Sequence, residues 1–111
     1  MSGSAEQGWV RDLNPEEVAR GMQEGRVLLV DVREPNEIAV ERFPDAAVVP
    51  LSAFNAADIP DPEGRDVVFA CRSGRRSVLA SQAAQAAGFA YDAHLAGGIL
   101  AWKEAGLPTE T

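Results

Sequence analysis

The sequence predicts an α/β domain with a mainly parallel central sheet and helices on both faces. Two apolar runs, residues 27–30 and 67–70, have the length and composition of buried strands. Segments with helix-start and helix-stop signals alternate with such runs over short connections. This alternation is typical of parallel strands joined by helices that pack on the sheet.

The first half of the chain contains two helix starts around one strand. Asn14-Pro15-Glu16-Glu17 combines an N-cap, a proline in the first turn and a glutamate three residues after the cap. Gly25 ends this helix, and the strand 27–30 follows and leads to Asp31. Residues 34–38 begin a second short helix.

The rest of the chain continues the alternation. Residues 47–49 are a third apolar segment, 51–57 could hold one helical turn, and the prolines and glycine of 58–64 predict a loop. After the strand 67–70, an alanine-rich helix is expected from Ser77 onward, ended by Gly88. Residues 89–95 predict a last strand. Gly97-Gly98 then opens a helix that ends at 106–108.

Length and composition indicate one small soluble domain. The 111 residues contain no internal repeat, so we expect one functional unit at 10–108, a flexible lead at 1–9 and a short tail at 109–111. No apolar run approaches the roughly 18 residues of a membrane span, and no signal peptide is recognisable. We therefore expect a cytoplasmic protein without a membrane partner.

Charge and cysteine content exclude several classes of protein. The net charge is −7, and the nine arginines and one lysine form no extended stripe, which argues against a nucleic-acid partner. A single cysteine cannot form an intramolecular disulfide, and the single His94 leaves no zinc-ligand spacing. We expect neither a metal nor a cofactor.

The only cysteine, Cys71, lies between a predicted strand and a predicted helix, in a loop rich in arginine. Segment 65–77 carries four arginines and one acid, a local charge of +3. A helix N-terminus and nearby arginines both favour a thiolate, and backbone N–H groups there can bind an anion. Cysteine is also often simply buried in the core. The arginine-rich loop favours a reactive thiol over that structural alternative.

Three separated segments of the sequence resemble the rhodanese family of single-domain sulfurtransferases. They are Asp31-Val32-Arg33-Glu34-Pro35-Asn36-Glu37, the Cys71 loop, and Leu95-Ala96-Gly97-Gly98-Ile99 with Trp102. The resemblance covers roughly residues 10–108 and implies the rhodanese sandwich fold and a cysteine that carries sulfur as a persulfide. Cys71 matches the catalytic residue. The residues that match the substrate-binding loop, whose backbone N–H groups surround the persulfide, are Arg72, Ser73, Gly74, Arg75, Arg76 and Ser77.

Loop length favours sulfur chemistry over phosphate chemistry. Phosphatases that resemble this fold place five residues between the cysteine and an arginine that grips phosphate. Here the sixth residue after Cys71 is Ser77, and Arg76 comes one position earlier. The resemblance therefore implies the shorter loop that the family associates with sulfur.

One segment departs from the family pattern. Members usually carry Gly-His-Ile-Pro-Gly-Ala where this chain has Glu41-Arg42-Phe43-Pro44-Asp45-Ala46. The loss of both glycines alters the local turn, although aspartate at position 45 tolerates a left-handed backbone better than most residues do. We expect the change to affect a surface that partners contact, not the nucleophile.

Other polar residues near the motifs are expected to be structural. Asp31, Arg33 and Glu37 could pair with one another or with loop arginines, and Glu37 is the best candidate to hold Arg76. His94 could donate a proton, but a lone histidine beside an apolar strand is more often a structural residue. Trp102 is expected in the core, and Gly97-Gly98 is expected to permit close packing below the loop.

The sequence thus predicts a sulfurtransferase that uses ping-pong kinetics. Cys71 would take sulfur from a small anionic donor such as thiosulfate, attracted by Arg72, Arg75 and Arg76. No second cysteine is present, so the sulfur must pass to an external acceptor: cyanide, a thiol or a protein. An alternative is a persulfide carrier whose donor and acceptor are both proteins. Phosphatase or arsenate reductase chemistry is disfavoured by the loop length and the missing second cysteine.

Overall fold

Five parallel strands form a single sheet in the order β1-β5-β4-β2-β3. The structure is a computed structural model that describes residues 8–111, so most of the expected flexible lead lies outside the described residues. The strands are β1 Arg11–Leu13, β2 Val27–Asp31, β3 Ala47–Val48, β4 Asp66–Ala70 and β5 Ala93–Leu95. The predicted α/β class with a parallel sheet is confirmed.

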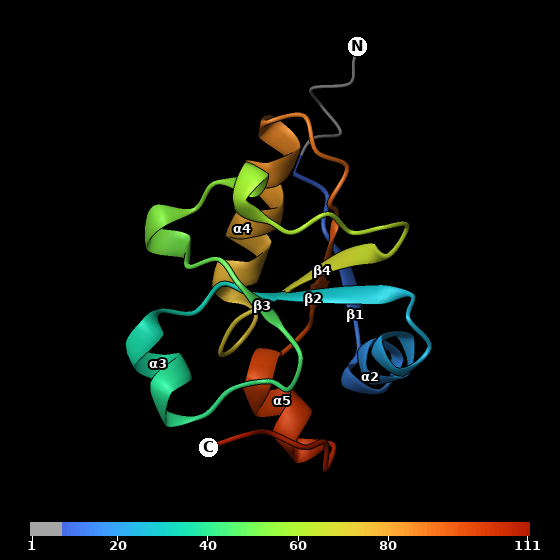
Figure 1. Ribbon diagram of the computed structural model, residues 1–111, viewed down its shortest axis with the longest axis vertical. Coiled ribbons are helices and arrows are strands. Elements are labelled where there is room, and N and C mark those ends of the chain that lie inside the picture. The colour runs from blue at the N-terminus through green and yellow to red at the C-terminus, as the bar shows by residue number, and fades with distance from the viewer. Residues whose placement is uncertain (1–7) are drawn as a thin grey trace.

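Helices cover both faces of this sheet. They are α2 Pro15–Gln23, α3 Pro35–Val40, α4 Arg75–Ala86 and α5 Gly98–Glu104, with 3-10 turns η1 Leu51–Ala53 and η2 Ala56–Asp58. In Figure 1, α4 lies on one side of β2 and β4, and α2 and α5 lie on the other. Helix α2 begins with the predicted capping box: the Asn14 side chain accepts from the Glu17 N–H at 2.8 Å, and the Glu17 carboxylate accepts from the Asn14 N–H at 2.9 Å.

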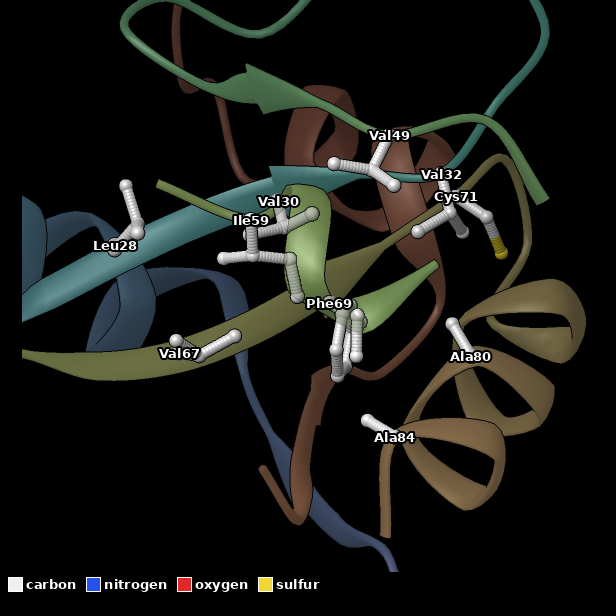
Figure 2. Close-up of a cluster of buried hydrophobic side chains, with 11 residues drawn as sticks. Leu28, Val30, Val32, Val49, Ile59, Val67, Phe69, Cys71, Ala80 and Ala84 are labelled. Atoms are coloured by element: carbon white, nitrogen blue, oxygen red, sulfur yellow. The ribbon is translucent and has the colours of Figure 1, made fainter. Parts of the chain in front are cut away.

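Alternating side chains of β2 and β4 supply two separate apolar layers. Val30 and Phe69 face α4, where Ala80 and Ala84 meet them, as Figure 2 shows. Leu29 and Val68, one residue earlier on each strand, face the opposite layer with Val18, Ile99 and Trp102. Successive strand side chains point to opposite faces, so a continuous apolar run fills both layers at once. This explains why residues 27–30 and 67–70 lack alternation.

The structure differs from the prediction in one additional strand and in the boundaries of two elements. Strand β1 was not expected, because it has three residues, two of them polar and exposed, at the sheet edge. Helix α4 begins at Arg75, not at Ser77, because Gly74 at φ 100° lets the chain turn directly into the helix. The last strand is only Ala93–Leu95; Phe89 and Tyr91 instead pack against the α4 layer and each other, with ring centroids 5.3 Å apart.

The unusual segment 41–46 is held in place by contacts of Arg42 and Phe43. Arg42 forms an antiparallel bridge with Glu110, so residues of the expected C-terminal tail pair with this segment through two backbone hydrogen bonds of 2.8 Å. Phe43 is buried and meets the Trp102 ring edge-on at 5.3 Å between centroids. Asp45, at a position where the resemblance implies a glycine, adopts φ 59°, the left-handed conformation that its side chain tolerates.

The backbone at Asp45 gives a test that compares two substitutions. We expect Asp45→Gly to be more stable than Asp45→Ala by about 1 kcal/mol in urea unfolding, because alanine is strained at positive φ and glycine is not. The matched site is Asp58, another exposed aspartate, whose φ is not positive. There the order should reverse, with alanine more stable than glycine. The same order at both positions would contradict the left-handed turn.

Candidate active site

The Cys71 thiol lies directly after the carboxyl end of β4, on the face that α4 covers. The residue is 1% exposed, whereas Arg72, Ser73 and Arg75 of the same loop are exposed. In Figure 2 the sulfur points away from the apolar side chains, toward the loop that leads into α4. The candidate nucleophile is therefore buried in a loop whose rim is in contact with solvent.

Hydrogen-bond donors of the loop converge on the sulfur. The Gly74 N–H donates to Cys71 Sγ at 3.1 Å, and the Ser77 N–H donates at 3.4 Å. The Ser77 hydroxyl is 3.5 Å from the same sulfur. Ser77 belongs to the first turn of α4, where backbone N–H groups have no partner within the helix. These donors are dipoles aimed at the position of a negative charge.

The same contacts lower the pKa of the Cys71 thiol. Burial raises the pKa of Cys71, but hydrogen bonds from the Ser77 hydroxyl and from the backbone N–H groups of Ser77, Gly74 and Ser73 outweigh it. The pKa therefore lies below the ordinary value. A larger fraction of the sulfur is then present as the nucleophilic thiolate at neutral pH.

The first turn of helix α5 binds the backbone of the Cys71 loop. The Ile99 N–H donates to the Cys71 carbonyl at 2.9 Å, and the Leu100 N–H donates to the Arg72 carbonyl at 3.2 Å. Gly98 makes this approach feasible, because a Cβ at Gly98 would overlap the carbonyl groups of both loop residues. The expected close packing at Gly97-Gly98 is confirmed, and it fixes the loop carbonyls away from the sulfur.

The loop arginines differ in their partners. Arg76 donates two hydrogen bonds to Glu37 of α3, at 2.6 and 2.9 Å, so the expected partnership is confirmed. Arg72 and Arg75 have no ion pair with residues in the described part of the chain. Of the three arginines predicted to attract a donor, Arg72 and Arg75 thus keep exposed guanidinium groups, whereas that of Arg76 is already bound.

A second ion pair stabilises the end of β2. Asp31 and Arg33 are 1% and 4% exposed, and their side chains are joined by contacts of 2.8 to 3.2 Å. Arg33 also donates to the Glu41 carbonyl at 3.0 Å and lies over the Phe43 ring. The expected pairing of Asp31 with Arg33 is confirmed, and Arg33 connects β2 to the unusual segment 41–46.

The sequence analysis named His94 but missed its contact with Ser77 and missed Asp12 altogether. His94 on β5 is within 2.8 Å of Ser77 Oγ through Nδ1 and within 2.6 Å of Asp12 Oδ1 through Nε2. Asp12 belongs to the unpredicted strand β1, whose register places it opposite His94. The polar residues of 11–13 give no signal that could reveal this contact, because it depends on pairing between distant segments.

Comparisons with known proteins agree with this geometry. Residues 14–105 match the model of the rhodanese-like domain. The chain belongs to the rhodanese-like family. A sulfurtransferase of Allochromatium vinosum is 44% identical over 74% of this chain and 77% of its own length. A human single-domain sulfurtransferase has a similar structure, with a TM-score of 0.71, 26% identity and coverage of 84% of this chain and 95% of the other.

Another relative extends beyond the rhodanese-like domain. An uncharacterised protein of Synechocystis is 45% identical over 86% of this chain, but this chain spans only 53% of that protein. Within residues 8–111, no helix is long and apolar enough to cross a membrane. The same residues contain no group of three or more His, Cys, Asp or Glu side chains that could hold a metal ion.

The contact between α5 and the rhodanese-like loop predicts a large effect of Gly98→Ala. Gly106→Ala is a matched control, because Gly106 also has positive φ, at 78°, but a Cβ there would meet nothing within 4 Å. We expect the control to lose about 1 kcal/mol of unfolding free energy through backbone strain alone. Gly98→Ala should lose a further 1 to 3 kcal/mol, roughly, from overpacking. Equal losses in urea unfolding would contradict the contact.

The Arg76–Glu37 pair predicts a specific acid dependence of stability. Hydrogen bonds from Arg76 lower the pKa of Glu37 from 4.5 to about 2. The folded value is below the unfolded one, so this contribution is fully present above pH 4.5 and is lost as the pH falls toward 2. Glu37→Gln should therefore flatten the fall in unfolding free energy across this range.

A double-mutant cycle checks the origin of that acid dependence. In an Arg76→Met background, Glu37→Gln should change the pH slope of urea unfolding much less, because the charge partner is already missing. An equal change in both backgrounds would mean that Arg76 does not cause the low pKa of Glu37.

Proposed function

We propose that this domain is a sulfurtransferase in which Cys71 carries a sulfane sulfur as a persulfide. The observation that carries the proposal is the convergence of the Gly74 and Ser77 backbone N–H groups on the Cys71 sulfur. Membership of the rhodanese-like family and a relative named sulfurtransferase support the same class of reaction. Donors arranged around a single sulfur suit a charge that stays on sulfur throughout the reaction.

The reaction has two half-reactions. The Cys71 thiolate attacks the outer sulfur of thiosulfate, the S–S bond of the donor breaks, and sulfite leaves with the electron pair. The cysteine then holds a persulfide anion. A nucleophilic acceptor such as cyanide next attacks the outer sulfur, the Cys71 S–S bond breaks, and the thiolate returns while thiocyanate leaves. This sequence predicts ping-pong kinetics and needs no cofactor.

Each loop feature has a role in this scheme. The exposed Arg72 and Arg75 attract a dianionic donor to the rim of the loop. The N–H groups of Gly74 and Ser77 stabilise the thiolate before attack and the persulfide anion after it. Arg76 holds the loop to α3 through Glu37 and does not bind the donor with its guanidinium.

Phosphate transfer fits the same geometry poorly. A phosphate-binding arginine must direct its guanidinium at the anion. The guanidinium of Arg76 instead donates two hydrogen bonds to the Glu37 carboxylate. Arsenate reduction through a disulfide within the chain is excluded, because the sequence contains a single cysteine. Sulfur transfer is the reaction that these residues support best.

Intact-mass measurement tests the persulfide directly. Protein incubated with thiosulfate should gain the mass of one sulfur atom, cyanide should remove it, and Cys71→Ser should show no gain. If wild-type protein gains nothing, thiosulfate is not the donor, and the same measurement is repeated with a persulfide-loaded cysteine desulfurase. No gain from either donor, or hydrolysis of an aryl phosphate that requires Cys71, would sink the proposal.

A further inference from the structure

A continuous chain of polar contacts leads from the surface to the buried sulfur. The Asp12 carboxylate contacts His94 Nε2 at 2.6 Å, His94 Nδ1 contacts Ser77 Oγ at 2.8 Å, and Ser77 Oγ lies 3.5 Å from Cys71 Sγ. His94 and Ser77 are 4% and 0% exposed, whereas the Asp12 side chain is 75% exposed. The polar atoms of the two buried residues are thus directed at one another, between a carboxylate and a thiol.

The hydrogens available to these four side chains allow two arrangements of the hydrogen bonds between them. An ionised carboxylate only accepts, so His94 Nε2 must carry a hydrogen in both. If Nδ1 has no hydrogen, it accepts the hydrogen bond of the Ser77 hydroxyl. Ser77 then has no hydrogen left for the sulfur, so the contact between Ser77 and Cys71 requires a protonated thiol that donates to Ser77 Oγ. If Ser77 instead donates to a thiolate, Nδ1 must itself carry a hydrogen and donate to Ser77 Oγ. The thiolate state in which every contact is made therefore requires a doubly protonated His94.

We propose that Ser77, His94 and Asp12 form a proton relay that ionises the Cys71 thiol and returns the proton. The S–H bond of Cys71 breaks as its proton moves to Ser77 Oγ, and the original Ser77 hydrogen moves to His94 Nδ1. The products are a thiolate, a neutral serine and an imidazolium held by Asp12. When an acceptor removes the outer sulfur, the reverse transfer restores the thiol. This role rests on the proposed sulfur transfer.

The three relay residues act differently. Ser77 touches the reacting sulfur, whereas His94 and Asp12 are positioning residues that act through Ser77. The pairing of β1 with β5 puts Asp12 and His94 opposite each other, so the carboxylate fixes the direction of the imidazole ring. The Cys71 loop packs against the imidazole ring of His94 at Gly74, where a Cβ would lie 3.6 Å from His94 Cε1.

Other charged groups near the relay must be kept constant in any test. Arg76 of α4 interacts with the charge of Cys71 and is bound by Glu37 of α3, with Glu34 also acting on it. Asp12 is the charged group that contacts His94 within the described residues. A change at Asp12 therefore alters the far end of the relay and leaves the arginine and its partners unchanged.

The rate of Cys71 alkylation by iodoacetamide against pH is the first measurement. Asp12→Asn keeps an oxygen acceptor but removes the charge that holds the imidazolium, so the midpoint should move upward by about half a pH unit or more. Ser77→Ala removes the hydroxyl that contacts the sulfur and should move the midpoint upward by about one pH unit.

The matched control is Asp92→Asn. It makes the same charge change on an exposed residue that pairs with Arg11, and it should leave the profile unchanged. An unmoved Asp12→Asn profile, or equal shifts in Asp12→Asn and Asp92→Asn, would overturn the relay.

The ring nitrogens of His94 provide a second, direct readout. His94 is the only histidine, so its ¹⁵N signals are unambiguous. Both ring nitrogens should be protonated at a pH where Cys71 is ionised, and at the same pH Cys71→Ala should lack the second proton. A neutral ring beside an ionised Cys71 would overturn the relay. Neither measurement uses a sulfur donor, so a failed relay is distinguishable from a failure of sulfur transfer.

Discussion

The conformation of the Cys71 loop depends on the contact between its backbone and the start of α5. Two N–H groups of α5 bind the carbonyls of Cys71 and Arg72, and Gly98 has no Cβ to keep the two segments apart. Because these carbonyls are bound on the far side, the loop can present N–H groups to the sulfur without placing a carbonyl oxygen beside it. Gly98 therefore helps to fix the backbone conformation of the loop around the sulfur.

The charge of the sulfur is balanced mainly by dipoles. Burial raises the pKa of Cys71, yet hydrogen bonds from Ser77, Gly74 and Ser73 bring it below the ordinary value. The guanidinium of Arg76, which also interacts with the charge of Cys71, is bound by Glu37. Fixed dipoles suit the proposed reaction, in which the site would alternate between a thiolate and a persulfide, because both carry one negative charge and need no rearrangement of their surroundings.

The apolar pattern predicted the two central strands and the helices around them, since continuous runs such as 27–30 are needed to fill both layers of the core. It also located Cys71 at a strand end, whereas the pairing of Glu37 with Arg76 was expected from their opposite charges and from the motifs in which they lie. It could not predict β1, whose polar residues pair with β5 across about eighty residues of sequence. Asp12 and the Ser77–His94 contact were missed for the same reason: a contact between distant segments leaves no local pattern in either one.

Ser77 both distinguishes this loop from the phosphatase loop and provides the first contact of the proposed relay. In the longer phosphatase loop, the sixth position after the cysteine is an arginine, which has only hydrogen-bond donors and stays charged. An arginine at that position could contact an anion but could not accept a proton from the thiol or pass one to His94. Ser77 has one donor and two acceptor positions, so it can contact the sulfur and His94 Nδ1 together. Ser77 thus links the buried sulfur, through His94, to the strand pair β1 and β5.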